Sequence, residues 1–427
     1  MTVRDAFTPE TVTNPVTESG RMAPKEYDGV LLASFGGPEG QDDVLPFLRN
    51  VTRGRGIPDE RLEEVSHHYR AFGGISPINA QNRELKSALE AELSGRGIDL
   101  PVLWGNRNWD PYLPATLKQA YDDGHRRLLM LTTSAYSCYS SCRQYREDIG
   151  MALTETGLDW RLEVDKVRQY FDHPGFVEPF IEGTAKGLAT VRASLAAAGT
   201  PDEPVHVLFA THSIPLRDAH AAGSSEGEPR SFDEDSAYVA QHLANGAEVI
   251  RRVDAAAGAA ADAAAGGAVS GAETPWSLVY QSRSGAPHVP WLEPDINDAL
   301  EELAGQGVKG VVIVPLGFVS DHMEVVWDLD TEAKETCDRL GLVFHRAPTP
   351  GTHSAFVSGL VDLISERTTA NYIADRPAMT KLGPWYDVCR PGCCANFRGA
   401  KPAIAGADST VGTGHDLRPA SAPKEVQ

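Results

Sequence analysis

Three carboxylates recur every four residues in one short segment, at Glu324, Asp328 and Glu332 of "GFVSDHMEVVWDLDTEAKE". In an α-helix each residue turns by about 100°, so this spacing places the three side chains in a row along one helix face. A solvated acidic face is one interpretation of the row. The residues between the acids are mostly apolar, among them Val325 and Leu329, which indicates a helix buried on much of its surface. A buried row of carboxylates could carry cations or protons inward or outward.

A histidine stands at the end of a predicted strand. The apolar run in "PVHVLFATHSIP" is typical of a buried parallel strand, and His212 closes it. A lone histidine is often structural, but ligands of doubly wound sheets bind beyond the carboxyl ends of the strands. A neutral imidazole in that place could bind a metal or accept a proton. The glycines of "SFGGPEG", after the first predicted strand, form a tight turn or cradle a phosphate, although the dinucleotide spacing and the P-loop lysine are missing.

Three of the six cysteines, Cys389, Cys393 and Cys394, fall within six residues near the end of the chain. Such a cluster suits either a disulfide or a metal site. The first 25 residues contain no signal-peptide core, and no apolar run approaches the roughly 20 residues of a membrane span, so we expect a cytoplasmic protein. In a reducing cytosol, clustered cysteines more often bind metals or do redox chemistry than form disulfides.

The composition limits the partners and the size of the fold. A formal net charge of −20 argues against nucleic acid or an anionic membrane surface as the main partner, because both require basic protein surface. A chain of 427 residues corresponds to about two domains. We therefore expect no nucleic-acid binding and no integral membrane contact.

Predicted strands alternate with predicted helices along most of the chain. Strand-like runs such as "YDGVLLASFGG", "RRLLMLTTSAYS" and "GVKGVVIVPLGFVS" are separated by helical patterns such as "NRELKSALEAEL" and "PDINDALEELAGQG". This alternation predicts an α/β fold with parallel sheets flanked by helices, and the pattern runs twice, which suggests two similar lobes. The predicted segments are a disordered N-terminal arm (1–26), a first lobe (27–172), a second lobe (173–367) with a low-complexity surface insertion (253–273), a cysteine-bearing extension (368–398) and a disordered tail (399–427).

Several motifs, in order along the chain, resemble those of the ferrochelatase family. They are "LLASFGGPEG", "NVTRGRGIP", "HYRAFGGISPIN", "GNRNWDPYL", "THSIP", "QSRSGAPHVPWLEPD" and "GFVSDHMEVVWDLD", and the match runs from about Tyr27 to Glu366. In detail the sequence is similar to the actinobacterial branch, the coproporphyrin ferrochelatases. The resemblance implies two Rossmann-like lobes that enclose a porphyrin cleft, and an enzyme that inserts Fe2+ into the macrocycle.

The resemblance also implies a catalytic centre. It assigns His212 and Glu324 to a facing pair across the cleft, at which the imidazole can accept a pyrrole proton and the carboxylate can hold or hand over iron. The family leaves the division of these roles open, and both residues are candidate ligands of the substrate iron. Asp328 and Glu332 continue from Glu324 as an acidic relay for iron and protons.

Residues that could hold the porphyrin follow from the same resemblance. Ser76 and Tyr145 match positions that bind the edge or the carboxylates of the macrocycle. Arg53 and Arg55 of "TRGRG" could clamp propionates, or they are ordinary surface arginines of a turn. Phe35 stands where some relatives carry a tyrosine that ligates the product iron, so no axial donor is present there.

Some ferrochelatases carry a [2Fe–2S] cluster held by one internal cysteine and three in a C-terminal extension. The resemblance implies such a cluster on Cys142, Cys389, Cys393 and Cys394, with Cys138 as the alternative fourth ligand. A structural zinc on the same thiolates is the other interpretation, because thiolates suit both.

The predicted function is insertion of ferrous iron into coproporphyrin III to give Fe-coproporphyrin III, or coproheme, in haem biosynthesis. A downstream coproheme decarboxylase would be a further partner. The alternatives are a protoporphyrin IX ferrochelatase, a cobalt or nickel chelatase, a non-catalytic haem-binding or haem-delivery protein, and an iron–sulfur redox or sensor protein. A protein that had lost catalysis would be expected to lack His212 or Glu324, and both are present.

Overall fold

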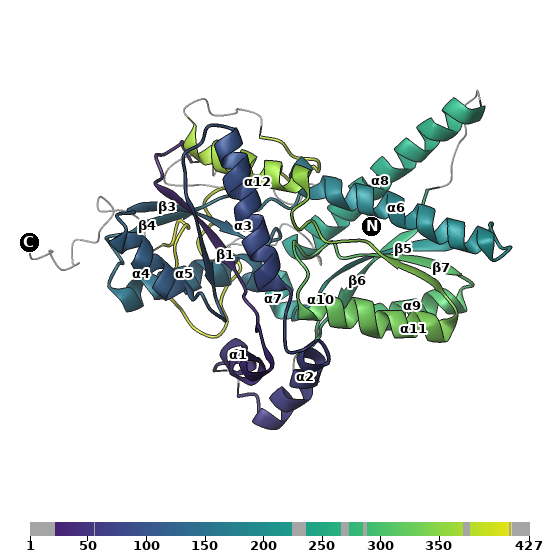
Figure 1. Ribbon diagram of the computed structural model, residues 1–427, viewed down its shortest axis with the longest axis horizontal. Helices are drawn as coiled ribbons and strands as arrows, with labels where there is room; N and C mark the ends of the chain where they lie inside the picture. The colour runs from purple at the N-terminus through teal and green to yellow at the C-terminus, as the bar shows by residue number, and fades with distance from the viewer. Residues whose placement is uncertain are drawn as a thin grey trace, which may run out of the picture.

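The computed structural model describes residues 22–54, 56–223, 236–265, 273–284, 288–369, 376–409 and 411. Two parallel β-sheets of four strands each form the frame of this part of the chain (Figure 1). The first sheet has the order β2 (Val102–Asn106), β1 (Gly29–Ser34), β3 (Arg127–Thr132) and β4 (Glu163–Lys166). The second has the order β6 (Trp276–Gln281), β5 (Val205–His212), β7 (Gly310–Val314) and β8 (Val343–Arg346). Both sheets follow one topology, which confirms the prediction of two similar α/β lobes.

Strand β1 shows why the first sheet carries helices on both faces. Successive side chains of a strand point to opposite faces, and all six residues of β1 are buried. Val30 and Leu32 pack in one core cluster with α3 (Ile78–Gly95), whereas Leu31 and Ala33 pack in a second cluster with α4 (Leu113–Asp122) and α5 (Gln144–Thr156). The lobe also contains a short 3-10 helix (Gln41–Asp43), α1 (Val44–Val51), α2 (Asp59–Ala71) and a π-helical turn, η3 (Tyr139–Arg143).

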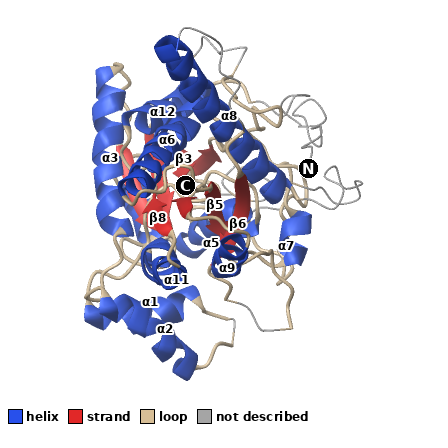
Figure 2. Ribbon diagram, turned by 90° about the vertical axis from the view of Figure 1, so that its right-hand side faces the viewer, coloured by secondary structure: helices blue, strands red, loops and turns tan. Residues whose placement is uncertain are grey.

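The second sheet is covered in the same way. Val207 and Phe209 of β5 pack toward α6 (Pro174–Ala197) and α8 (Ala237–Ala265), and Leu208 and Ala210 pack toward α9 (Ile296–Gly305) and α11 (Lys334–Leu340). Figure 2 shows this sheet between the two pairs of helices. The remaining helical segments are α7 (Leu216–Ala221), α10 (Met323–Trp327), the π-helical η4 (Asp328–Ala333) and α12 (Ser354–Thr368).

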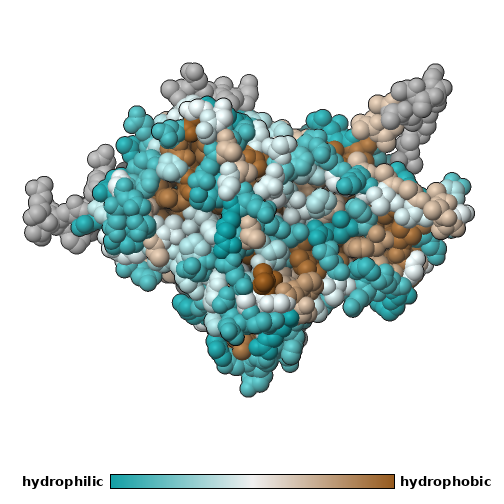
Figure 3. Space-filling view, in the orientation of Figure 1, coloured by the Kyte–Doolittle hydropathy of each residue, from teal (hydrophilic) through white to brown (hydrophobic). Residues whose placement is uncertain are grey.

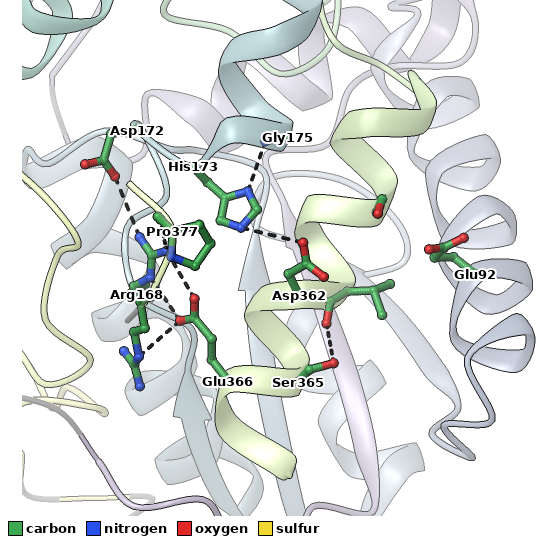
Figure 4. Close-up of polar contacts among 12 residues, drawn as sticks. Glu92, Arg168, Asp172, His173, Gly175, Asp362, Ser365, Glu366 and Pro377 are labelled. Carbon is green, nitrogen blue, oxygen red and sulfur yellow. Dashed lines mark hydrogen bonds and ion pairs between the residues drawn. The ribbon is translucent and has the colours of Figure 1, made fainter. Parts of the chain in front are cut away.

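A buried ion network joins the two lobes (Figure 4). Arg168, which follows β4, donates from Nε and Nη2 to the two carboxylate oxygens of Glu366 on α12, at 3.0 and 3.1 Å. Its Nη2 also donates to the carbonyl of Pro377, at 2.9 Å, and Asp172 lies 3.7 Å from its Nη1. Because α12 packs on both α3 and α6, this network fixes the lobe junction and the start of the C-terminal extension together.

The termini and the low-complexity segment are more ordered than expected. Residues 22–26 of the predicted arm are packed, since the amide of Met22 donates to Asp387 and Lys25 pairs with Glu163. The predicted tail is ordered over residues 399–409, where Ile404 is fully buried. The first part of the predicted surface insertion continues α8 as far as Ala265, and most of its residues up to Ala259 are exposed. Sequence patterns missed the order of the two terminal segments because their contacts, such as those of Met22 with Asp387 and of Ile404 with Arg146, are made with residues far away in the chain.

The surface seen in Figure 3 is largely hydrophilic, with separate small apolar patches. Large apolar side chains that remain exposed include Ile57, Phe72, Ile75 and Phe397. In the part of the chain that the structure describes, no helix is both long and apolar enough to cross a membrane.

The raised pKa of the Asp172 carboxyl predicts that the stability of the protein changes with pH. Burial raises its pKa from 3.8 to about 6, although Arg168 opposes the shift. Between about pH 4 and pH 6 the folded state therefore binds more protons than the unfolded state, and stability falls as pH rises. Asp172→Asn removes this titration. The difference in melting temperature, variant minus parent, should therefore increase from pH 4.5 to pH 6.5 and then stay constant to pH 8. The corresponding change in the free energy of unfolding is at most about 3 kcal/mol.

Thermal unfolding of both proteins over this pH range gives the comparison. Asp298→Asn, at an exposed position of α9, controls for the loss of a carboxylate. A constant difference between parent and Asp172→Asn across the range would contradict the account.

Candidate functional site

A cavity of about 830 Å3 lies between the two lobes. Its volume falls in the range of about 300–1,000 Å3 that is typical of small-molecule sites. Both lobes contribute apolar and polar side chains to its walls. From the first lobe these include Phe35, Phe47, Leu62, Tyr69, Ser76 and Tyr145, and from the second His212, Ile214, Trp291, Glu324, Trp327 and Asp328.

His212 is the last residue of β5, so its imidazole enters the cavity at the carboxyl end of a parallel strand. Its Nδ1 lies in hydrogen-bond contact with the backbone carbonyl of Ser213. A carbonyl oxygen can only accept, so Nδ1 carries the proton in the neutral ring and Nε2 keeps its lone pair. That Nε2 lies 3.6 Å from Oε2 of Glu324. The ring is therefore set up to accept a proton on the cavity side.

Glu324 lies in the first turn of α10 and keeps 47% of its side chain exposed to the cavity. Nδ1 of His322 lies 3.8 Å from the same Oε2. Burial lowers the pKa of His322 even though Glu324 raises it, so this second imidazole is neutral at physiological pH. Sequence analysis missed His322, although it stands two residues before Glu324 at the N-cap of α10.

The catalytic pair does not face across the cleft, which corrects the sequence-based expectation. Strand β5 and helix α10 belong to the same lobe, and the contact between His212 and Glu324 leaves no room for a macrocycle between them. Both side chains lie on the wall of the second lobe. Phe35, directly after β1, lines the cavity from the first lobe. A flat ligand in this cavity would meet His212 and Glu324 on one of its faces.

The acidic row is present, but the regular α-helix predicted for it is wrong. Helix α10 ends at Trp327, and Asp328–Ala333 forms a wider π-helical turn. Such turns are rare and often occur at functional sites. All three carboxylates still line the cavity.

Asp328 is the most perturbed acid of the row. Burial raises its pKa to about 8, against the hydrogen bond from the Ser282 hydroxyl, and neighbouring Glu324 adds to the increase. Gln281 donates from Nε2 both to Asp328, at 3.3 Å, and to the Glu324 carbonyl, at 3.0 Å. Asp328 is thus mostly protonated at neutral pH. Gln281 and Ser282, the end of β6 and its neighbour, were not identified as site residues from the sequence.

Glu332 is exposed and accepts a hydrogen bond from the indole Nε1 of Trp327 at 2.8 Å. The Trp327 ring in turn stacks on His68 of α2, with 4.1 Å between the ring centroids. Within the described ranges, no three His, Cys, Asp or Glu side chains have the geometry of a metal site.

Ser76 and Tyr145 line the cavity as predicted positions for the porphyrin edge. A Cβ atom on Gly37 would lie 2.7 Å from Cβ of Ser76, so a glycine is required there for β1 to end beside Ser76. This close approach favours the tight-turn interpretation of the "SFGGPEG" glycines. The Tyr145 ring lies beneath the Arg107 guanidinium, 4.7 Å from its centroid, and burial raises the pKa of the phenol.

Of the two candidate propionate arginines, the structure describes only Arg53. Arg53 is exposed, does not line the cavity in the described part of the chain, and donates to Oδ1 of Asn50 at 2.6 Å. It would have to release Asn50 to reach a ligand. Arg55 lies outside the described residues.

Four thiols converge where the C-terminal extension packs on the first lobe. Sγ of Cys142 lies 3.9 Å from Sγ of Cys389, and Sγ of Cys393 lies 3.7 Å from Sγ of Cys394. All four are buried, and none forms a disulfide. Cys138 differs, because it lines the cavity and its sulfur accepts from the amide of Ser141 at 3.4 Å.

The two lobes share the same parallel strand order, and the contact between His212 and Glu324 lies in the cavity between them. These features define the class of α/β proteins that bind a ligand between two lobes. Residues 27–368 match the ferrochelatase family model, and the chain belongs to the ferrochelatase family.

Two curated relatives show how far the similarity extends. The chain is 61% identical over 388 residues to the coproporphyrin III ferrochelatase of Leifsonia xyli subsp. xyli, covering 90% of this chain and 95% of the relative. It is 53% identical over 387 residues to that of Tropheryma whipplei, covering 90% and 93%. Among solved structures, SirB from Bacillus subtilis with Fe3+ aligns at a TM-score of 0.40 and 10% identity over 81% of this chain and 96% of SirB.

The His–Glu contact generates a test by substitution. His212→Ala removes the free Nε2, and Glu324→Gln removes the carboxylate beside it. Each variant should insert iron at least about 100-fold more slowly, within the range lost with an acid–base group, while porphyrin affinity stays within about threefold. Anaerobic absorbance assays and fluorescence quenching measure the two quantities.

Glu335→Gln is the matched control, because Glu335 is exposed on the same helical segment and does not line the cavity. If either cavity variant kept near-parental turnover, the assignment of His212 and Glu324 as the catalytic centre would be wrong.

Proposed function

We propose that the protein inserts ferrous iron into coproporphyrin III and so produces Fe-coproporphyrin III (coproheme). The observation that carries the proposal is the contact between His212 and Glu324 on the cavity wall. Curated relatives at 61% and 53% identity named coproporphyrin III ferrochelatase support the choice of substrate.

The reaction requires that the macrocycle lose two N–H protons as Fe2+ enters it. The lone pair on Nε2 of His212 accepts one proton. The Glu324 carboxylate holds the incoming iron, releases it to the pyrrole nitrogens and then accepts the second proton. Because both groups occupy one wall, iron delivery and proton removal take place at the same face of the ring.

The acidic row offers a path for protons away from this face. Asp328, protonated at neutral pH, lies between Glu324 and the exposed Glu332 along the helical segment. It can pass its proton outward and accept another from Glu324, held in place by Ser282. Iron could travel along the same carboxylates in the opposite direction.

Four arginines could bind the carboxylates of the substrate, although acidic side chains also line the cavity. Among the described residues, the arginines that line it are Arg61, Arg107, Arg283 and Arg398. Guanidinium groups pair strongly with carboxylates, and Ser76 and Tyr145 offer hydroxyls toward the ring edge. Coproheme keeps all four propionates, so we propose a cytoplasmic setting in which a coproheme decarboxylase consumes the product.

Substrate choice is testable by direct competition of porphyrins. Without detergent, coproporphyrin III should accept Fe2+ at least tenfold faster than protoporphyrin IX, because two of the four carboxylate contacts are lost with the latter. Anaerobic absorbance spectra follow each product. Equal rates, or faster metallation of protoporphyrin IX, would exclude coproporphyrin as the preferred substrate, and faster insertion of Co2+ or Ni2+ would exclude iron.

We also propose that Cys142, Cys389, Cys393 and Cys394 hold a [2Fe–2S] cluster. The two close pairs of thiols offer four sulfur ligands, which cluster binding would have to draw together, because no metal-site geometry is preformed among the described residues. When bound, the cluster would supply a one-electron redox centre.

Arg146 supports the fit of an anionic group at these thiols. Its guanidinium is fully buried, and its Nη1 has no hydrogen-bond partner, while Nε donates to the carbonyl of Ile404. Burial would lower the Arg146 pKa, but the neighbouring Cys389 and Cys142 raise it overall. A buried cation beside four thiolates offsets negative charge that would otherwise be costly to bury.

Cysteine-to-serine variants separate the possible ligands. Cys389→Ser and Cys142→Ser should each lose the visible chromophore and melt at a lower temperature, because a group bound only by the folded state adds its binding free energy to stability. Cys138→Ser should keep the chromophore, and so should Cys337→Ser, a buried thiol of the second lobe. Iron and sulfide analysis of each variant is the measurement.

A full cluster in Cys142→Ser would transfer the ligand role to Cys138. If the parent protein contained zinc and no sulfide, the proposal of an iron–sulfur cluster would be wrong.

A further inference from the structure

Arg398 belongs to the C-terminal extension, four residues after Cys394 and beyond the family-matched residues 27–368. It nevertheless lines the cavity between the lobes. Its guanidinium lies over the ring of Tyr139, 5.3 Å from the centroid, and Tyr139 lines the same part of the cavity. The extension therefore contributes a cation to the substrate cavity.

The backbone that carries Arg398 is held from several sides. The amide of Cys394 donates to the carbonyl of Ala221 at 3.2 Å. Nδ2 of Asn396 donates to Oε2 of the buried Glu147 at 2.8 Å, and Oδ1 of Asn396 accepts from the amide of Arg398 at 3.0 Å. These bonds fix the position from which the Arg398 side chain reaches the cavity.

Glu147 also holds Tyr139, the residue whose ring lies beneath the Arg398 guanidinium. The Tyr139 hydroxyl donates to Oε2 of Glu147 at 3.2 Å, so one carboxylate oxygen orders both the extension and the π-helical turn beneath it. Ser140 and Ser141, next in that turn, also line the cavity. A guanidinium and two hydroxyls thus share one wall.

Arg398 is exposed at the cavity wall, and among the described residues its charge has no acidic partner. Arg143 pairs with Glu147 and Asp408, whereas no ion pair between Arg398 and an acidic side chain occurs among the described residues. A positioned guanidinium at a cavity wall matches the geometry of a carboxylate ligand. The proposed substrate carries four such carboxylates at its periphery.

We infer that Arg398 binds a propionate of the substrate at the cavity wall, so that the extension anchored by the cysteines forms part of the substrate site. This inference rests on the proposed function, since it takes coproporphyrin III as the ligand. It assigns Arg398 a role in binding and substrate choice, whereas the chemistry belongs to other residues.

Arg398→Ala should raise both the Kd and the KM for coproporphyrin III about tenfold, as expected for loss of one charge-assisted contact, and leave kcat within about twofold. Arg398→Lys keeps the charge without the planar fork and should recover part of the loss. Lys401→Ala removes an exposed cation of the same extension that does not line the cavity, and should match the parent.

The tetramethyl ester of coproporphyrin III, measured in matched detergent, separates a carboxylate contact from a change of shape. Parent and Arg398→Ala should bind this ester equally well. Melting temperature and visible absorbance of each variant report whether the extension remains folded. Unchanged coproporphyrin binding in Arg398→Ala, or an equal loss for acid and ester, would overturn the inference.

Failure of the proposed function has a different signature. If the parent itself does not metallate coproporphyrin III, the substrate assignment fails whatever the variants do. If the parent does and Arg398→Ala behaves like it, only the role of Arg398 is lost.

Discussion

The buried ion pair between Arg168 and Glu366 sets the relation between the two lobes, and the cavity depends on that relation. Arg168 leaves the first sheet, Glu366 lies on the helix that packs on both lobes, and Pro377 begins the extension. Removing one partner of a buried pair leaves an uncompensated charge, which costs about 3–5 kcal/mol. Since the cavity takes its walls from both lobes, their separation and angle follow from this junction.

Within that frame, the proposed chemistry is concentrated on one lobe. His212 closes β5 and Glu324 lies in the first turn of α10, and their contact places the proposed proton acceptor and the proposed iron carrier on the same wall. The first lobe supplies Phe35 and the extension supplies Arg398 to the remaining walls, to which we assign the binding of the ring and its carboxylates. In this proposal one face of the macrocycle reacts while the other walls hold it.

Much of this was predictable, and the failures have a common cause. The strands and the doubled topology follow from local patterns, whereas the roles of His212 and Glu324, taken from motifs, stay predictions. The π-helical turn at Asp328 does not, because packing against β6 and α2 decides it. The order of residues 399–409, which were predicted to be part of a disordered tail, was also missed, since their contacts, such as that of Arg146 with Asp408, join residues 262 positions apart. Site residues in segments that are held by distant contacts cannot be recognised from the spacing of apolar residues along the sequence.

A crystal structure of the protein with bound coproporphyrin III tests the central claim most directly, through the contacts made by each face of the ring. The account predicts that His212 and Glu324 both approach one face and that Phe35 lies against the other. A macrocycle bound between His212 and Glu324, or outside the cavity, would contradict it.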